Sequence, residues 1–188
     1  MKKNFLKRKI ARYMKKKQLI KSIEYTKLEK PFITKARKNY TVSNILFNIS
    51  EKDDLKKVLS ISQDFNMYEW VIIVSYYSMY MSSLAALARL GFKSKSHAAT
   101  ISVLKEHYVK KERLEAKHID SLSKAYMLSE NLITKLVNTK SKRETAQYDA
   151  TPAISRENAV TALADADEFV TKIEDILGKK ESVAQKEK

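Results

Sequence analysis

The chain has 188 residues, of which 44% are hydrophobic and 31% are charged, so it can bury the core of one ordinary domain. It contains two glycines, two prolines and no cysteine. This composition excludes a disulfide scaffold, a thiol nucleophile and cysteine-bearing metal sites. It also argues against folds that need many tight turns or a glycine-rich phosphate loop.

Positive charge is concentrated at the N-terminus. Residues 1–40 hold 15 Lys and Arg against two Glu, a net charge of +13, whereas the other 148 residues hold 22 basic and 20 acidic side chains. We therefore expect a basic arm over residues 1–29, a nearly neutral domain over 30–178 and a charged tail over 179–188. Such an arm is typical of proteins that bind a polyanion, which can be RNA, DNA or an anionic lipid surface. The alternative is a lysine-rich helix that only aids solubility.

The arm itself has a helical pattern, because apolar residues recur at helical spacing between its cations: Phe5, Leu6, Ile10, Tyr13, Ile20 and Ile23. On RNA the cations would contact phosphates, and on a membrane the helix would lie flat. The scarcity of bulky aromatic residues favours nucleic acid. No uninterrupted apolar run follows the lysines, so the arm differs from a secretory signal, and we expect a cytoplasmic protein. The predicted nucleic-acid-binding residues of the arm are Lys7, Arg8, Arg12, Lys15, Lys16 and Lys17.

Apolar periodicity predicts five further helices. They cover residues 30–49, residues 67–90, a segment that begins at the N-cap Ser96, a long segment with apolar positions from Ile119 to Leu136, and a segment that begins at the N-cap Ser155. No stretch alternates apolar and polar residues as a half-buried strand does. The sequence therefore predicts an all-α, up-and-down helical bundle of about five helices with a basic N-terminal helical extension.

The helix over residues 67–90 includes 18 residues without a charge, from 71 to 88, which approaches the length of a membrane span. Seven of the 18 carry a hydroxyl group, which a central bundle helix can pair and lipid cannot. We therefore predict a buried helix ended by Gly91, and no transmembrane segment. The small, hydroxyl-rich face over residues 75–86 could approach a helix of a second copy closely, which predicts a homodimer. The alternative is that this face is the centre of one bundle.

Few residue patterns point to chemistry. His97, His107 and His118 are 10 and 11 residues apart, which matches no metal-ligand spacing, so we expect no metal and no cofactor. The informative segment is the connector over residues 140–149. Its cations and its tyrosine and aspartate suit an anion site, although cations also cap a helix C-terminus. The residues in question are Lys140, Lys142, Arg143, Tyr148 and Asp149.

Three segments in this order resemble the HEPN family over roughly residues 30–177. They are the tyrosine-rich YYSMYMSSLAALARLG (76–91) followed by KSKSH (93–97), the connector RETAQYD (143–149), and the helix that begins ENA (157–159). The resemblance implies a helical bundle that often dimerises and binds or cleaves RNA. It also implies a toxin–antitoxin or defence role, with a nucleotidyltransferase-type protein as a partner.

The resemblance also assigns site residues. Ribonuclease members carry an arginine followed a few residues later by a histidine, which together can stabilise charge on phosphorus and move protons. Arg143 has the place of the arginine, but the residue five positions later is Tyr148, whose phenol has a pKa of about 10 and is a poor base. The implied catalytic residues are Arg143, Tyr148 and Asp149, and His97 is added to the nucleic-acid-binding set with Lys140 and Lys142.

The sequence therefore predicts a HEPN-like protein that binds RNA or another nucleic acid, with ribonuclease activity that is weak or lost. His118, 25 residues before Arg143, would lie about 37 Å away along a continuous helix and could not replace the missing histidine within one chain. Two alternatives stay open. One is an active, metal-independent ribonuclease toxin that uses Arg143. The other is a protein-interaction module with no nucleic-acid role.

Overall fold

The structure is a computed structural model that describes residues 5–142 and 154–179. This part of the chain holds seven α-helices: α1 (Phe5–Lys15), α2 (Glu29–Glu51), α3 (Asp53–Val58), α4 (Tyr68–Arg89), α5 (His97–Leu104), α6 (Ala116–Lys142) and α7 (Arg156–Gly178). A 3₁₀ helix, η2 (Ile23–Leu28), and a π-helical turn, η3 (Lys105–Val109), connect them. The predicted all-α bundle is confirmed: its five helices are α2, α4, α5, α6 and α7, and the basic extension is α1.

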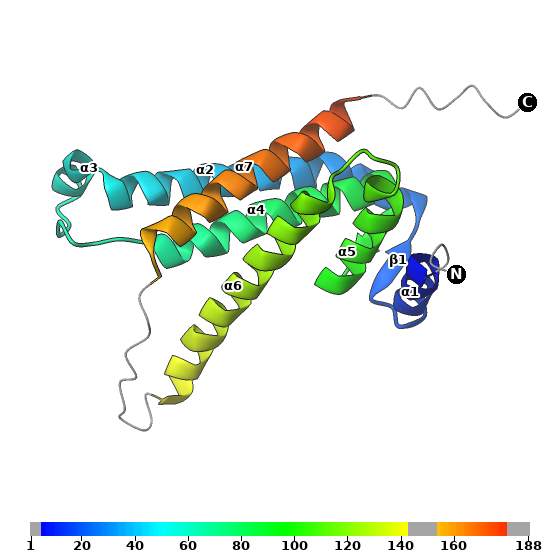
Figure 1. Cartoon of the computed structure of the whole chain (residues 1–188), viewed down its shortest axis with the longest axis horizontal. Coiled ribbons are helices and arrows are strands. Elements are labelled where there is room, and N and C mark those ends of the chain that lie inside the picture. The colour runs from blue at the N-terminus through cyan, green and yellow to red at the C-terminus, as the bar shows by residue number, and fades with distance from the viewer. Residues whose placement is uncertain (1–4, 143–153, 180–188) are drawn as a thin grey trace, which may run out of the picture.

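Helix α4 is the centre of the bundle. Helices α2 and α7 flank it and also contact each other, while α6 crosses it and diverges toward its own C-terminal end (Figure 1). A charge-free sequence suits this position because α4 packs on several sides at once. By length and composition α4 could cross a membrane, and 78% of its most apolar stretch is buried inside the bundle.

The hydroxyl groups of α4 are paired within the chain. Ser75 shares a hydrogen bond of 2.7 Å with Ser43 of α2, and Ser78 donates to the carbonyl of Ala36 at 2.7 Å. Ser82 and Ser83 donate to the carbonyl of Met79. All four serines of α4 are fully buried. The small-residue face is therefore occupied by α2 and by the rest of the bundle, and it is not open to a helix of a second copy.

Both predicted N-caps are present. The hydroxyl of Ser96 accepts from the amide of Ala99 at 3.5 Å, and that of Ser155 accepts from the amide of Asn158 at 3.3 Å. Each satisfies an amide that the first helical turn leaves unpaired. Helix α6 is continuous over 27 residues, about 40 Å, and includes the predicted apolar positions from Ile119 to Leu136.

One expectation about secondary structure is wrong: the structure contains a sheet. Strands β1 (Leu19–Lys21) and β2 (Phe92–Ser94) pair antiparallel, with Leu19 opposite Ser94 and Lys21 opposite Phe92. Backbone bonds from Ser22 to Gly91 (2.8 Å) and from Lys95 to Gln18 (2.9 Å) extend the pairing at both ends. Three residues are too few to show an alternating pattern, and the two strands are about 70 residues apart in the sequence.

The N-terminal segment is packed against the bundle. Ile10 of α1 and Leu19 of β1 are 8% and 1% exposed and belong to the main hydrophobic core, with Phe92, Leu104 and Tyr108. Gly91 permits this contact, because it has a φ of +74° and a Cβ at this position would lie 2.9 Å from the carbonyl oxygen of Ser22. The division of the chain at residue 29 stays a prediction, but the arm shares one core with the domain.

Candidate nucleic-acid interface

Helix α1 buries Ile10 against the bundle and presents its cations to solvent. Ile10 is buried, whereas the six cations predicted to bind nucleic acid are all exposed. The helix ends in a left-handed turn at Lys17 (φ 54°), where the amide of Gln18 donates to the carbonyl of Tyr13 at 3.0 Å and that of Lys17 to the carbonyl of Met14 at 3.0 Å. This capping motif directs the chain into β1 and so fixes the direction of α1.

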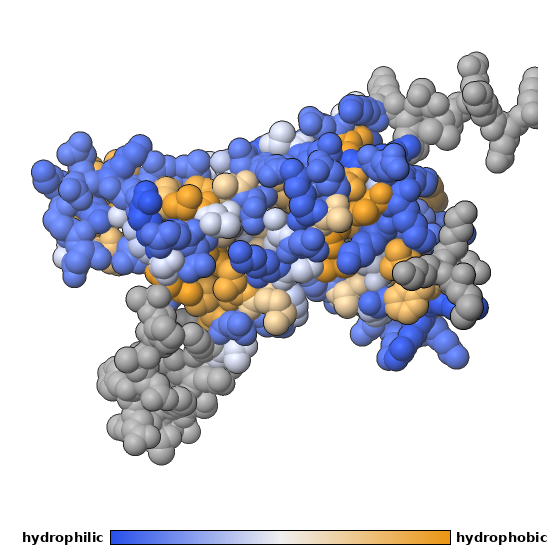
Figure 2. Space-filling view, in the orientation of Figure 1, coloured by the Kyte–Doolittle hydropathy of each residue, from blue (hydrophilic) through white to orange (hydrophobic). Residues whose placement is uncertain are grey.

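The sheet brings further cations beside α1. Lys21 is the last residue of β1, Lys93 lies in β2, and Lys95 follows β2 at the level of Gln18. We call the exposed cations of α1, its cap and the sheet the basic surface: Lys7, Arg8, Arg12, Lys15, Lys16, Lys17, Lys21, Lys93 and Lys95. None of these nine side chains forms an ion pair with a carboxylate of the described residues. In Figure 2, blue hydrophilic residues form the lower edge of this end of the molecule, next to a smaller orange patch.

Aromatic rings lie close to two of these cations and to Lys9 of α1. The ammonium nitrogen of Lys21 is 5.1 Å from the centre of the Phe92 ring, and that of Lys93 is 5.6 Å from the Tyr25 ring. The ammonium of Lys9 is 6.0 Å from the Tyr13 ring. These contacts orient the lysines without neutralising them, since the partners carry no charge. The basic surface therefore keeps its full charge for an anionic ligand.

His107 lies at the edge of this surface, half-buried in η3. Its ring is 5.8 Å from the ring of Phe92, on which Lys21 also lies. Burial lowers the pKa of His107, and the charges of Lys111, Lys21 and Lys7 lower it further, while Glu106 opposes them. Residues from α1, β1 and the end of η3 therefore act on one imidazole.

His97, the predicted binding histidine, has a different environment. It begins α5 and stacks on Tyr126 of α6, with ring centres 4.0 Å apart and planes at 13°. The rings of Tyr76 and Tyr80 lie 6.1 and 6.2 Å away. Both ring nitrogens are buried without a hydrogen-bond partner, and this burial lowers the pKa of His97 to about 4. In this arrangement the neutral ring packs between helices, and its nitrogens are closed to a phosphate.

The predicted catalytic connector lies mostly beyond the end of α6. Lys140 and Lys142 belong to the last turn of α6, where the backbone alone is described, and Arg143, Tyr148 and Asp149 lie outside the described residues. The three histidines are far from that end of α6. His118 is in its first turn, with Nε2 3.3 Å from Glu168, and His97 meets α6 at Tyr126, 16 residues or about 24 Å before Lys142. His107 lies beside β2.

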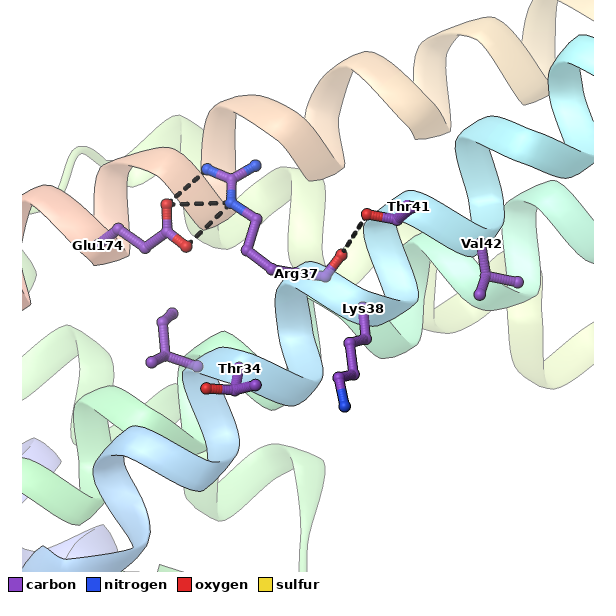
Figure 3. Close-up of a pocket in the computed structure, with 7 residues that line it drawn as sticks. Thr34, Arg37, Lys38, Thr41, Val42 and Glu174 are labelled. Carbon is purple, nitrogen blue, oxygen red and sulfur yellow. Dashed lines mark hydrogen bonds and ion pairs between the residues drawn. The ribbon is translucent and has the colours of Figure 1, made fainter.

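A groove lined by α2 and by Glu174 of α7 lies elsewhere on the bundle. Figure 3 shows that its Arg37 is bound to Glu174. The Nε of Arg37 donates to both carboxylate oxygens of Glu174 at 2.9 and 3.0 Å. Its two terminal nitrogens bond to Asp167 at 3.1 Å and to Thr171 at 2.8 Å. Because its donors are bound in this way, Arg37 joins α2 to α7 and has no free pair of N–H donors for a ligand. The groove is therefore a structural contact.

The sequence identified the cations of α1 but not all of their neighbours. Lys21, His107 and Lys111 join the site only because β1 pairs with β2 and α1 packs near η3. Nothing in a single sequence shows a pairing between residues this far apart. The KSK pattern before His97 was the one available signal, since it places Lys93 and Lys95 in a short basic segment. Among the described residues, no group of His, Asp and Glu side chains is arranged to hold a metal ion.

Fold and surface together define an all-α bundle protein with one strongly cationic end. The comparison with protein families agrees with the resemblance found in the sequence: the family model described as HEPN domain matches residues 43–176. The chain belongs to the HEPN domain family, whose members are RNA-related, nuclease-like helical proteins. No curated protein matches the chain. The match leaves out α1, the sheet strand β1 and the first part of α2, so seven of the nine cations of the basic surface lie outside the matched residues.

Proposed function

We propose that this protein binds single-stranded RNA through the basic surface, and that the bound strand is not cleaved or is cleaved only weakly. The observation that carries the proposal is the set of nine exposed cations without an ion-pair partner among the described residues, on one packed end of a HEPN-family bundle. Cations that contact phosphates release counterions from the nucleic acid, which supplies most of the affinity of such a surface.

The packing of α1 supports a binding role over a solubility role. A helix that only aids solubility needs no fixed position, whereas α1 is held by a buried Ile10, a left-handed cap at Lys17 and the β1–β2 pairing. Fixed cations lose less conformational entropy on binding than cations on a free tail. The arrangement therefore suits recognition of a phosphate backbone.

Weak or lost ribonuclease activity is inferred from the residue types and from the places of the histidines. Tyr148 follows Arg143 where a histidine would be expected, and a phenol holds its proton at neutral pH. The described structure places all three histidines away from the C-terminal end of α6. A toxin–antitoxin or defence role, with a nucleotidyltransferase-type partner, is the biological setting we propose for such a protein.

The test replaces charges and keeps the fold. Removal of residues 1–29 is a poor experiment, since it would delete the core residues Ile10 and Leu19. The full chain with Lys7, Arg8, Arg12 and Lys15 changed to Gln should bind a labelled oligouridylate more weakly. Its slope of log K against log salt should be shallower by about 0.7 for each phosphate that the variant no longer neutralises. An unchanged slope would remove the basic surface from the interface.

The same binding measurement, repeated with lipid vesicles, separates RNA binding from the alternative functions. Binding to vesicles that contain phosphatidylglycerol, with none to RNA, would overturn the proposal in favour of a membrane surface. Binding to neither would leave a protein-interaction module. Incubation with labelled total RNA, with and without a chelator, tests cleavage directly. Efficient chelator-insensitive cleavage by the unchanged protein would show an active, metal-independent ribonuclease that uses Arg143.

A further inference from the structure

The surroundings of His107 combine four cationic or titratable groups with one buried ring. Phe92 is 5% exposed, and its ring centre is 5.1 Å from the ammonium of Lys21 and 5.8 Å from the imidazole of His107. Helix α1, which carries Lys7, packs against η3, and Lys111 follows η3 by two residues. All three lysines are exposed, and none forms an ion pair with a carboxylate of the described residues.

We propose that Lys7, Lys21 and Lys111 form, together with His107, a subsite for one phosphate group of the bound nucleic acid. This inference rests on the proposed RNA binding and gives it a defined location. Three ammonium groups without a carboxylate partner, on segments that pack beside His107, create a positive potential that a single phosphate relieves. The three lysines come from three segments of the chain: α1, β1 and the residues after η3.

The subsite has a consequence for pH dependence. In the free protein, burial and the three lysines disfavour the imidazolium form of His107, and Glu106, which is bonded to Lys110, only partly offsets them. A bound phosphate opposes the lysine charges and accepts a hydrogen bond from the imidazolium, so it raises the pKa of His107. Binding therefore takes up a proton. Affinity is highest below the pKa of the free state and is lost as pH rises through the higher pKa of the bound state.

Fluorescence anisotropy with a labelled oligouridylate tests this, because uracil does not titrate between pH 5 and 8 and the RNA itself adds no slope. The affinity of the full chain should rise as pH falls across this range, by no more than about tenfold per pH unit, since one proton is linked. His107→Gln should remove most of this rise. His97 does not contribute, because its pKa is about 4.

Lys21→Gln and Lys111→Gln test the lysines, and both positions are exposed, so the fold should tolerate them. Each should weaken binding about two- to fivefold and make the pH dependence shallower. Lys57→Gln in α3 is the matched control, because it removes the same charge from the opposite end of the molecule (Figure 1). If Lys21→Gln and Lys111→Gln behave like Lys57→Gln, or if His107→Gln keeps the full pH dependence, the subsite is overturned while RNA binding stands. If the unchanged protein binds no RNA, the proposed function fails first.

Discussion

The two cationic regions of the chain, α1 and the end of α6, are built differently. Helix α1 is short but is fixed on the bundle by Ile10, by its cap and by the adjoining sheet. Helix α6 is long, and its last turns extend away from α4 and α7 before the chain reaches Arg143 (Figure 1). On the viewed face, apolar residues gather where α6 leaves the bundle (Figure 2). Charge alone therefore does not distinguish a fixed binding surface from a projecting helix end.

The difference also separates binding from chemistry. The N-terminal surface has cations, aromatic rings and a titrating histidine within one packed region. The end of α6 leads to the connector that carries Arg143 and Tyr148. Tyr126, on which His97 stacks, lies about 24 Å along the helix before Lys142, and His118 lies further away, in the first turn of α6. The predictions that follow test this separation.

The largest expected effect concerns the connector. Tyr148→His places a histidine five positions after Arg143 and supplies a base with a pKa near 6.5. We expect chelator-insensitive RNA cleavage to increase about 10²- to 10⁴-fold, the usual contribution of a positioned general base. Gel analysis of end-labelled RNA measures it.

Adding Arg143→Ala to this variant should abolish the gain in cleavage. Adding Arg143→Lys should keep only part of the gain, because lysine lacks the planar guanidinium group. No gain at all would mean that more than the base is missing.

The next effect tests whether the arm belongs to the fold. Leu19 is 1% exposed, so Leu19→Ala should lower the free energy of unfolding by about 2–4 kcal/mol, because the variant buries less apolar surface and leaves a residual cavity. Urea denaturation measures it. Ile20→Ala is the control, because Ile20 lies on the opposite face of β1 and is only half-buried. Equal, small losses in both variants would show that the arm is a separate segment, and the contrast with α6 would disappear.

Most helices were predictable from the sequence, because each has an apolar stripe or a charge-free core long enough to show its period. The caps at Ser96 and Ser155 were predictable for the same local reason. The sheet was not, since pairing of Leu19 with Ser94 is a long-range event between two very short strands. The left-handed turn at Lys17 was also unpredictable, because the usual signal for it is a glycine.

The candidate site, like the fold, could be predicted from the sequence only in part. The cations of α1 follow from composition and period, whereas Lys21, His107 and Lys111 become neighbours only through tertiary packing. The small-residue face of α4 shows the reverse error. Small hydroxyl residues predict a close helix contact but do not say which helix supplies it, and Ser43 and Ala36 of α2 are the partners in this structure.

The homodimer stays a prediction, and because the small-residue face of α4 is buried we expect it to use another surface. Trp70 and Tyr77 of α4 are 50% and 40% exposed, and they lie on one helical face with the half-buried Val74 and Met81. We expect the dimer to form along this uncharged stripe. Trp70→Ala with Tyr77→Ala should weaken it at least about thirtyfold, as truncation of central aromatic residues does at other interfaces. Light scattering at micromolar concentration measures it. A monomeric unchanged protein, or a variant as dimeric as its parent, would contradict this.

The smallest effect concerns His97, which joins the two regions by packing α5 against Tyr126 in the middle of α6. Its pKa is about 4 in the folded protein, against about 6.5 for a free imidazole, because its ring nitrogens are buried without partners; Glu130 opposes this shift. Between these values the unfolded chain binds more protons than the folded one, so the contribution of His97 to stability is complete above pH 6.5 and is lost as pH falls toward 4.

His97→Phe keeps the stacked ring and removes the titration. At pH 7 the urea midpoints of the two proteins should nearly coincide, and between pH 6.5 and 4 the unchanged protein should lose stability relative to the variant. The carboxylates that titrate in the same pH range affect both proteins equally, so the difference in stability between the two proteins reports His97 alone. An imidazole resonance of His97 that titrates above pH 6 would show that water or an anion reaches the ring, and would return His97 to the binding residues.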